Sequence, residues 1–200
     1  WMADEYKRMN PNHPNTMACV TGKPVSEGGI RGRTEATGRG IQYALQEVFR
    51  HPEDIAFAGL SGDLKDKRII VQGLGNVGYH AALFLQTEDK ALITGVIERD
   101  GAIVDDSGID IEALRAHIVE TGGVKGFPNY VEDGQAVFKK DCDILIPAAV
   151  EGVIDERNAH YVQASIVVEA ANGPLTYEAN EILRDRNCLI VPDLYANSGG

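Results

Sequence analysis

Short apolar runs alternate with amphipathic stretches along the chain from about residue 67 onward. Runs rich in Ile, Val and Leu predict strands at 68–72, 91–98, 143–147, 165–169 and 188–191. Apolar residues at helical spacing predict helices over 34–50, 76–86, 111–120, 155–162 and 177–186. Because the strand runs are continuously apolar rather than alternating, they indicate a parallel sheet covered on both faces. We therefore predict a doubly wound, three-layer α/β domain.

Composition and charge narrow the classes of function. The 200 residues include 19 basic and 30 acidic ones, a net charge of -11. This balance argues against nucleic acid and against an anionic membrane surface as partners. No apolar run approaches the ~20 residues that cross a bilayer, so a membrane protein is not expected. The three cysteines are widely spaced, which predicts reduced thiols and a cytoplasmic location. The five histidines do not fall at metal-binding spacing, so we expect no metal site.

A glycine-rich segment carries the most specific chemistry. Gly73, Gly75 and Gly78 form a GxGxxG string that directly follows a predicted strand and opens a predicted helix. Gly73 would make the tight turn, Gly75 would let a pyrophosphate approach the backbone, and Gly78 would let the helix pack closely on the sheet. The alternative is a turn that uses its glycines for geometry alone. The context favours a dinucleotide-binding domain of the Rossmann type.

Two charged residues at the end of the next predicted strand indicate which dinucleotide is bound. Glu98 lies twenty residues after Gly78, where a carboxylate can accept hydrogen bonds from ribose hydroxyls and repel a 2′-phosphate. Arg99 follows directly and could pair with such a phosphate. The sequence therefore favours NAD and leaves NADP possible.

Four further segments are recognisable together with the glycine turn. They are ACVTGKP at 18–24, GRTEATGRG at 32–40, EAANGP at 169–174 and PDLYANSGG at 192–200. In this order they closely resemble glutamate dehydrogenases, within the family that also includes leucine, phenylalanine and valine dehydrogenases. The resemblance implies oxidative deamination of L-glutamate to 2-oxoglutarate and ammonia with NAD or NADP, in a homo-oligomer, a hexamer.

The resemblance also implies roles for individual residues. Cofactor-binding residues would include Thr37 at the nicotinamide, Asn76 at the pyrophosphate or the nearby ribose, and Val77. Ala148, Ala149 and Asn172 would also lie at the nicotinamide end. Arg33 and Asn197 would lie on the substrate side. From the residues alone, each also has an ordinary structural interpretation, such as helix entry, close packing or a turn.

The same resemblance divides the chain. It implies that residues 1–33 extend from an upstream substrate domain and that 34–200 form a dinucleotide-binding domain truncated at its C-terminal end. The family's catalytic lysine and aspartate would lie upstream of Trp1, so we expect this chain alone to be inactive. The alternatives are a non-catalytic dinucleotide-sensing module and a dehydrogenase for another amino acid.

Overall fold

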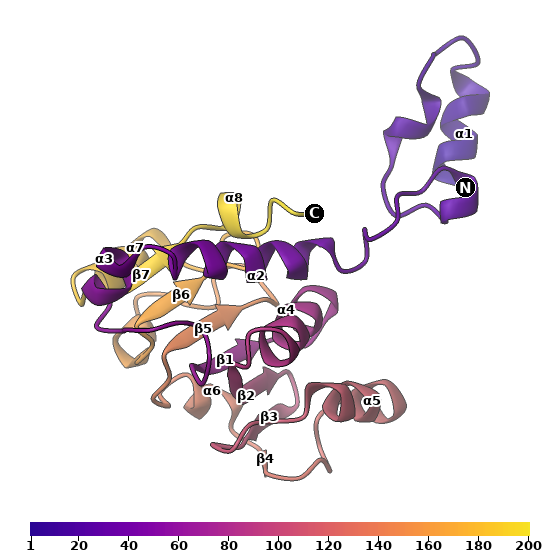
Figure 1. The fold of residues 1–200 in the computed structure, drawn as a ribbon. Coiled ribbons are helices and arrows are strands. Elements are labelled where there is room, and N and C mark those ends of the chain that lie inside the picture. The colour runs from indigo at the N-terminus through magenta and orange to yellow at the C-terminus, as the bar shows by residue number, and fades with distance from the viewer.

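A computed structural model describes all of residues 1–200 and shows a seven-stranded sheet between two layers of helices (Figure 1). The strand order is β4-β3-β2-β1-β5-β6-β7. The parallel strands are β1 (Arg68–Gln72), β2 (Leu92–Glu98), β5 (Ile144–Pro147), β6 (Ile166–Val168) and β7 (Leu189–Val191). Two short antiparallel strands, β3 (Gly101–Val104) and β4 (Tyr130–Val131), extend the sheet beyond β2. The predicted α/β fold of the Rossmann type is confirmed.

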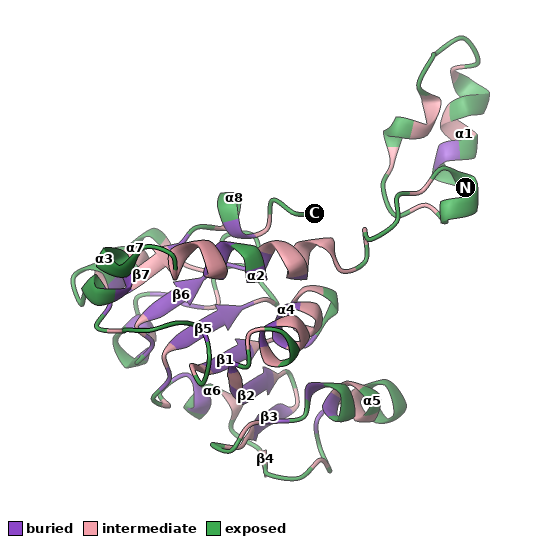
Figure 2. Ribbon diagram, in the orientation of Figure 1, coloured by how far each residue is buried: buried purple, intermediate pink, exposed green.

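Neighbouring residues of each central strand enter different cores, because successive side chains of a strand point to opposite faces. Ile69 and Val71 join one apolar cluster, whereas Ile70 joins the other. The first cluster is covered by α2 (Ala36–Val48), α4 (Asn76–Thr87) and α5 (Ile111–Thr121). The second is covered by α6 (Gly134–Val137), the 3-10 turn η3 (Ala159–Tyr161) and α7 (Tyr177–Arg184). Burial on both faces explains the continuously apolar strand sequences, and Figure 2 shows β1, β2, β5 and β6 largely in the buried colour.

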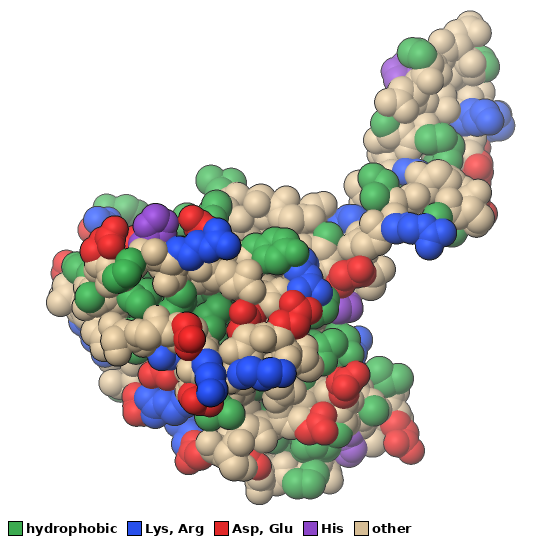
Figure 3. All heavy atoms as spheres, viewed as in Figure 1, with side chains coloured by type: hydrophobic (Ala, Val, Ile, Leu, Met, Phe, Trp, Pro, Cys, Tyr) green, Lys and Arg blue, Asp and Glu red, His purple; other side chains and the backbone are tan.

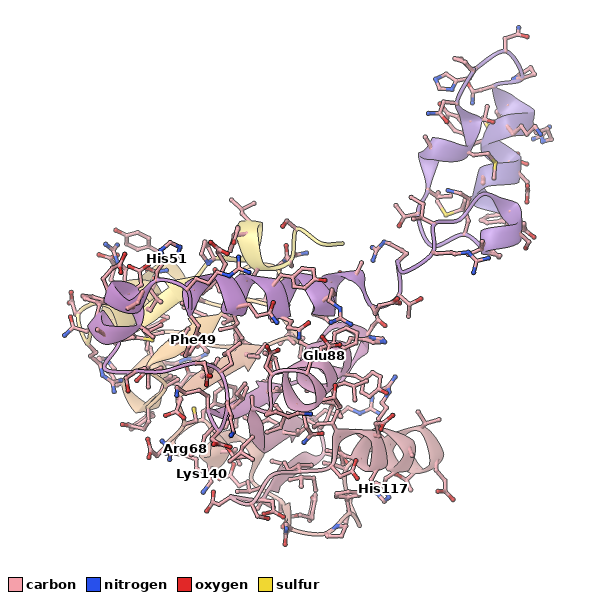
Figure 4. The ribbon with its side chains drawn as sticks, viewed as in Figure 1. Phe49, His51, Arg68, Glu88, His117 and Lys140 are labelled. Atoms are coloured by element: carbon pink, nitrogen blue, oxygen red, sulfur yellow. The ribbon has the colours of Figure 1, made fainter.

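Helices α2 and α4 pack closely where both carry small residues. A Cβ placed on Gly38 would lie 2.5 Å from the Cβ of His80, so glycine is needed at this crossing. A polar network around the buried Gln42 joins α2 to the end of α4: Gln42 accepts from Arg39 at 2.7 Å and donates to Glu88 at 3.1 Å. Glu88 lies between the two helices in Figure 4. Both predicted helices are therefore present and fixed relative to each other.

The structure corrects the predicted elements in three places. Residues 155–162 form only η3, because side chains compete for the backbone there: Asn158 accepts from the Asp155 N–H and donates to Val153 O. The helix predicted over 34–50 breaks near His51 as expected, but Pro52 then begins a short second helix, α3 (Pro52–Phe57). Strands β3 and β4 were not predicted.

Residues 1–33 form an arm that projects away from the sheet (Figure 1). The arm contains α1 (Met2–Met9) and two 3-10 turns, η1 (Thr16–Cys19) and η2 (Val25–Glu27). At the other end of the chain, α8 (Asp193–Ala196) and the residues after it lie over α2. None of the helices combines the length and the apolar character that crossing a membrane would require.

Candidate functional site

The predicted site residues of the sheet follow the carboxyl ends of its parallel strands. The chain runs from β1 outward to β2 on one side, and β5 starts the other half of the sheet directly beside β1. Open α/β sheets bind ligands at such a point of reversal. Gly73 follows β1, Ala148 follows β5, and their backbones lie together because the Ala148 N–H donates to Gln72 O at 2.8 Å.

The three glycines of the turn have three different surroundings. Gly73 has φ +89, and a Cβ placed on it would lie 2.7 Å from the Cβ of Ala149. A Cβ on Gly78 would lie 1.9 Å from Gly73 O. Gly75 has φ -69, which any residue adopts, and a Cβ there would meet nothing within 4 Å. The fold itself therefore requires Gly73 and Gly78, but not Gly75.

The open space at Gly75 adjoins the start of α4. Gly75 is the N-cap of that helix, and no side chain caps its first N–H groups. Free N–H groups and the positive end of the helix dipole favour a phosphate at such a helix start. The residues present therefore fit the pyrophosphate of a dinucleotide.

Glu98 reaches back to the same turn. Its Oε1 accepts from the Leu74 N–H at 2.5 Å, and its Oε2 has no hydrogen-bond partner in the protein. The neighbouring Arg99 is exposed and donates to Gly122 O at 3.4 Å. The predicted acidic residue thus lies at the glycine turn, with one oxygen occupied there and the other free.

A second charged residue at the turn was not predicted. Arg115 of α5 donates from Nη1 to Leu74 O at 2.8 Å, and its guanidinium lies 5.5 Å from the ring centroid of Tyr79. Arginine in the middle of a helix, some forty residues from the glycine turn, matches no motif. Only the packing of α5 beside α4 reveals this contact.

Hydrogen bonds join the loops after β5, β6 and β7. Asn197 donates from Nδ2 to Oδ1 of Asn172 at 3.0 Å, so these two predicted residues are brought together. The Gly173 N–H donates to Asp193 Oδ2 at 2.9 Å, and the Asp193 N–H donates to Glu169 Oε2 at 3.1 Å. The Gly152 N–H donates to Gly173 O at 2.9 Å. Asn172 therefore stands on a loop anchored from both sides.

Glu169 is a buried carboxyl group within this network, with 8% of its surface exposed. Burial raises the pKa of Glu169 above its ordinary value, and the negative charge of Asp193 raises it further. Hydrogen bonds from backbone N–H groups, chiefly that of Asp193, act in the opposite direction. Glu169 begins the EAANGP motif, but no role was predicted for it from the sequence.

The start of α2 contributes the remaining predicted residues. Asn76 donates from its side-chain amide to Thr34 O at 2.5 Å, which links the glycine turn to the segment before α2. Thr37 lies against Gly200: a Cβ placed on that glycine would be 2.3 Å from Thr37 Oγ1. Arg33 instead lines a cavity of about 360 Å³ between the arm and Gly200, and its buried Nε has no partner. Arg33 therefore faces the arm and Gly200 rather than the glycine turn.

This glycine turn on a doubly wound parallel sheet defines a dinucleotide-binding domain of the Rossmann type. The model of the Glutamate/Leucine/Phenylalanine/Valine dehydrogenase family matches residues 28–200. The chain belongs to this family, as its sequence motifs predicted.

The chain is similar to several glutamate dehydrogenases. It is 50% identical to a probable glutamate dehydrogenase of Sinorhizobium fredii, with all of this chain and 46% of the relative aligned. It is 40% identical to a catabolic NAD-specific glutamate dehydrogenase of Bacillus subtilis, with all of this chain and 44% of the relative aligned. It is 39% identical to an NADP-specific glutamate dehydrogenase of Halobacterium salinarum, with all of this chain and 46% of the relative aligned.

A solved structure confirms the fold across the whole chain. The hetero-hexameric glutamate dehydrogenase of Thermus thermophilus superposes with a TM-score of 0.85 at 32% identity, covering all of this chain and 45% of that one. The chain thus spans about half the length of the relatives it matches.

Proposed function

We propose that the chain is the NAD-binding domain of a dehydrogenase that converts L-glutamate to 2-oxoglutarate and ammonia. The observation that carries the cofactor proposal is Gly75, a glycine with ordinary dihedral angles and open space beside an uncapped helix start. Nothing in the fold requires glycine there, whereas close approach of a pyrophosphate does. The substrate is supported by the names of the relatives and by the motifs shared with them.

The proposed roles follow the position of each residue. Gly73, Gly75 and Gly78, together with Asn76 and Val77, hold the pyrophosphate. Glu98 accepts from the ribose with its free oxygen, and Arg99 lies beside it. Thr37, Ala148, Ala149 and Asn172 border the nicotinamide, and Arg33 and Asn197 lie toward the substrate. The bound nicotinamide supplies the hydride chemistry, while these residues bind and orient it.

The charge of Glu98 favours NAD over NADP. No cationic side chain lies within 4.0 Å of the Glu98 carboxylate, so its negative charge is not neutralised by an ion pair. A 2′-phosphate near the free Oε2 would therefore be repelled. Arg99 supplies the opposite charge next to it, and a relative in this family is named NADP-specific. We therefore propose NAD as the preferred cofactor, with some use of NADP.

Calorimetric titration of the chain with NAD and with NADP tests these assignments. We expect tighter binding of NAD, and we expect Glu98→Ser to narrow the difference because the repulsion is lost. Glu178→Ser, at an exposed carboxylate in the first turn of α7, is the matched control and should leave the ratio unchanged. Tighter binding of NADP by the parent chain would contradict the role of Glu98, and binding of neither would contradict the proposed function.

The proposal extends to assembly and location. We propose a homo-oligomer of six subunits; the number of subunits follows the solved relative, which is itself a hetero-hexamer. We propose a cytoplasmic location because all three cysteines are free thiols, two of them buried.

A further inference from the structure

The glycine turn is made of residues that do not fix their own conformation. Leu74 stands between two glycines, and glycine loses more conformational freedom on ordering than any other residue. A turn with this sequence keeps one arrangement only if neighbouring groups hold it. Its ability to receive a pyrophosphate depends on that arrangement, because a preorganised site does not spend binding free energy on ordering.

Three contacts hold Leu74. Its side chain is 1% exposed and packs in the core beneath α4. Its N–H donates to Glu98 at the end of β2, and its carbonyl accepts from Arg115 of α5. Both polar groups of this residue's main chain are therefore held by charged side chains from two different elements.

Helix α5 is a firm support for the second of these contacts. Ile111 and Leu114 are completely buried, and the Asp110 side chain caps the helix by accepting from the Ala113 N–H at 2.9 Å. Figure 4 shows α5, marked by His117, lying beside α4. Arg115 has no carboxylate within 4.0 Å, so an ion pair does not hold its guanidinium elsewhere.

We propose that Arg115 is a positioning residue for dinucleotide binding. By donating to the Leu74 carbonyl, Arg115 holds the turn in the conformation in which Gly75 and the first N–H groups of α4 face the pyrophosphate. Glu98 then has two tasks, one oxygen holding the turn and the other facing the ribose. The inference rests on the proposed function, because it assigns Arg115 to the same site. It predicts that Arg115 affects NAD and NADP alike, whereas the charge of Glu98 separates them.

The test compares Arg115→Met with the parent by calorimetry with NAD and NADP and by hydrogen exchange of the unliganded turn. Methionine keeps an unbranched apolar side chain beside Tyr79 but removes the donor and the charge. We expect both affinities to fall by about tenfold, since a hydrogen bond to a charged group is lost. The NAD/NADP ratio should stay unchanged, and the amides of Leu74 and Tyr79, which donate to Glu98 and to Gly75 O, should exchange faster.

Two further variants and a control complete the design. Arg115→Lys retains the charge and an ammonium donor and should recover part of the affinity, which a role in packing alone would not predict. Arg115→Leu also lacks the donor and the charge; it carries the same expectation as the methionine variant and replaces it if that variant fails to fold. Arg184→Met, on the other face of the sheet, is the control and should bind as the parent does.

The outcomes separate this inference from the proposed function. Unchanged affinity and unchanged exchange in Arg115→Met would overturn the role of Arg115 and leave the cofactor assignment intact. A parent chain that binds neither dinucleotide would overturn the proposed function. In that case, faster exchange of the Leu74 and Tyr79 amides in the variant would still support the role of Arg115 in fixing the turn, and unchanged exchange would overturn it.

Discussion

At the scale of single residues, the three glycines of the turn differ in what an added side chain would meet. Gly75→Val should abolish dinucleotide binding, because its methyl groups would fill the space next to the uncapped start of α4. The fold should persist, since φ is ordinary there and nothing lies within 4 Å of an added Cβ. Calorimetry with NAD and circular dichroism measure the two effects. Full binding by this variant would show that phosphates do not approach Gly75.

Gly78→Ala is the contrasting control at the same turn. Its Cβ would lie 1.9 Å from Gly73 O, so strand and helix would have to separate. Overpacking of this kind costs about 1–3 kcal/mol. We therefore expect Gly78→Ala to lower the free energy of unfolding, an effect that Gly75→Val should not share.

At the scale of elements, the parallel strands could be read from the sequence almost to the residue, because burial on both faces leaves a continuous apolar run. Strands β3 and β4 could not, because they are four and two residues long and lie at the edge of the sheet. The places of Asn172 and Asn197 after strands could be predicted, but the hydrogen bond between them could not. Arg115 was missed because its role depends on how α5 packs, which no local pattern encodes.

Glu169, in the loop network after β6, makes the free energy of unfolding depend on pH. Because burial raises the pKa of Glu169, the folded chain binds this proton more tightly than the unfolded chain does. The contribution of Glu169 to stability is therefore greatest below the ordinary glutamate pKa of about 4.3 and falls as the pH rises through the raised value. Glu169→Gln should remove this fall, as measured by chemical denaturation at about pH 5 and about pH 8.

The amide of Glu169→Gln keeps an oxygen that can accept from the Asp193 N–H, so the loop after β6 should remain in place. Glu178→Gln, on the exposed side of α7, serves as the control and should follow the parent. If Glu169→Gln loses as much stability with rising pH as the parent does, a group other than Glu169 causes the pH dependence of stability.

At the scale of the whole molecule, we expect these 200 residues to show no glutamate-dependent reduction of NAD. The Lys23 ammonium, in the arm, donates to the carbonyls of Met17 and Val20. Asp193 accepts from the N–H groups of Gly173 and Leu194. These hydrogen bonds hold each group within its own loop, and a general acid or base placed at the reacting atoms contributes ~10²–10⁴-fold to a rate. The absorbance of NADH measures this, and robust turnover by the purified chain would place the chemistry in this domain.

The two edge strands of the sheet determine how readily sheets of two copies could pair at high concentration. β4 is only two residues long, and α3 contacts the three-residue β7 at the opposite end. Figure 3 shows charged side chains spread over this face of the molecule rather than one continuous apolar band. Short and covered edge strands offer few unpaired backbone groups to a neighbouring sheet. Growth of the sheet from one copy into the next is therefore disfavoured, because neither edge offers a neighbouring copy a long row of unpaired N–H and C=O groups.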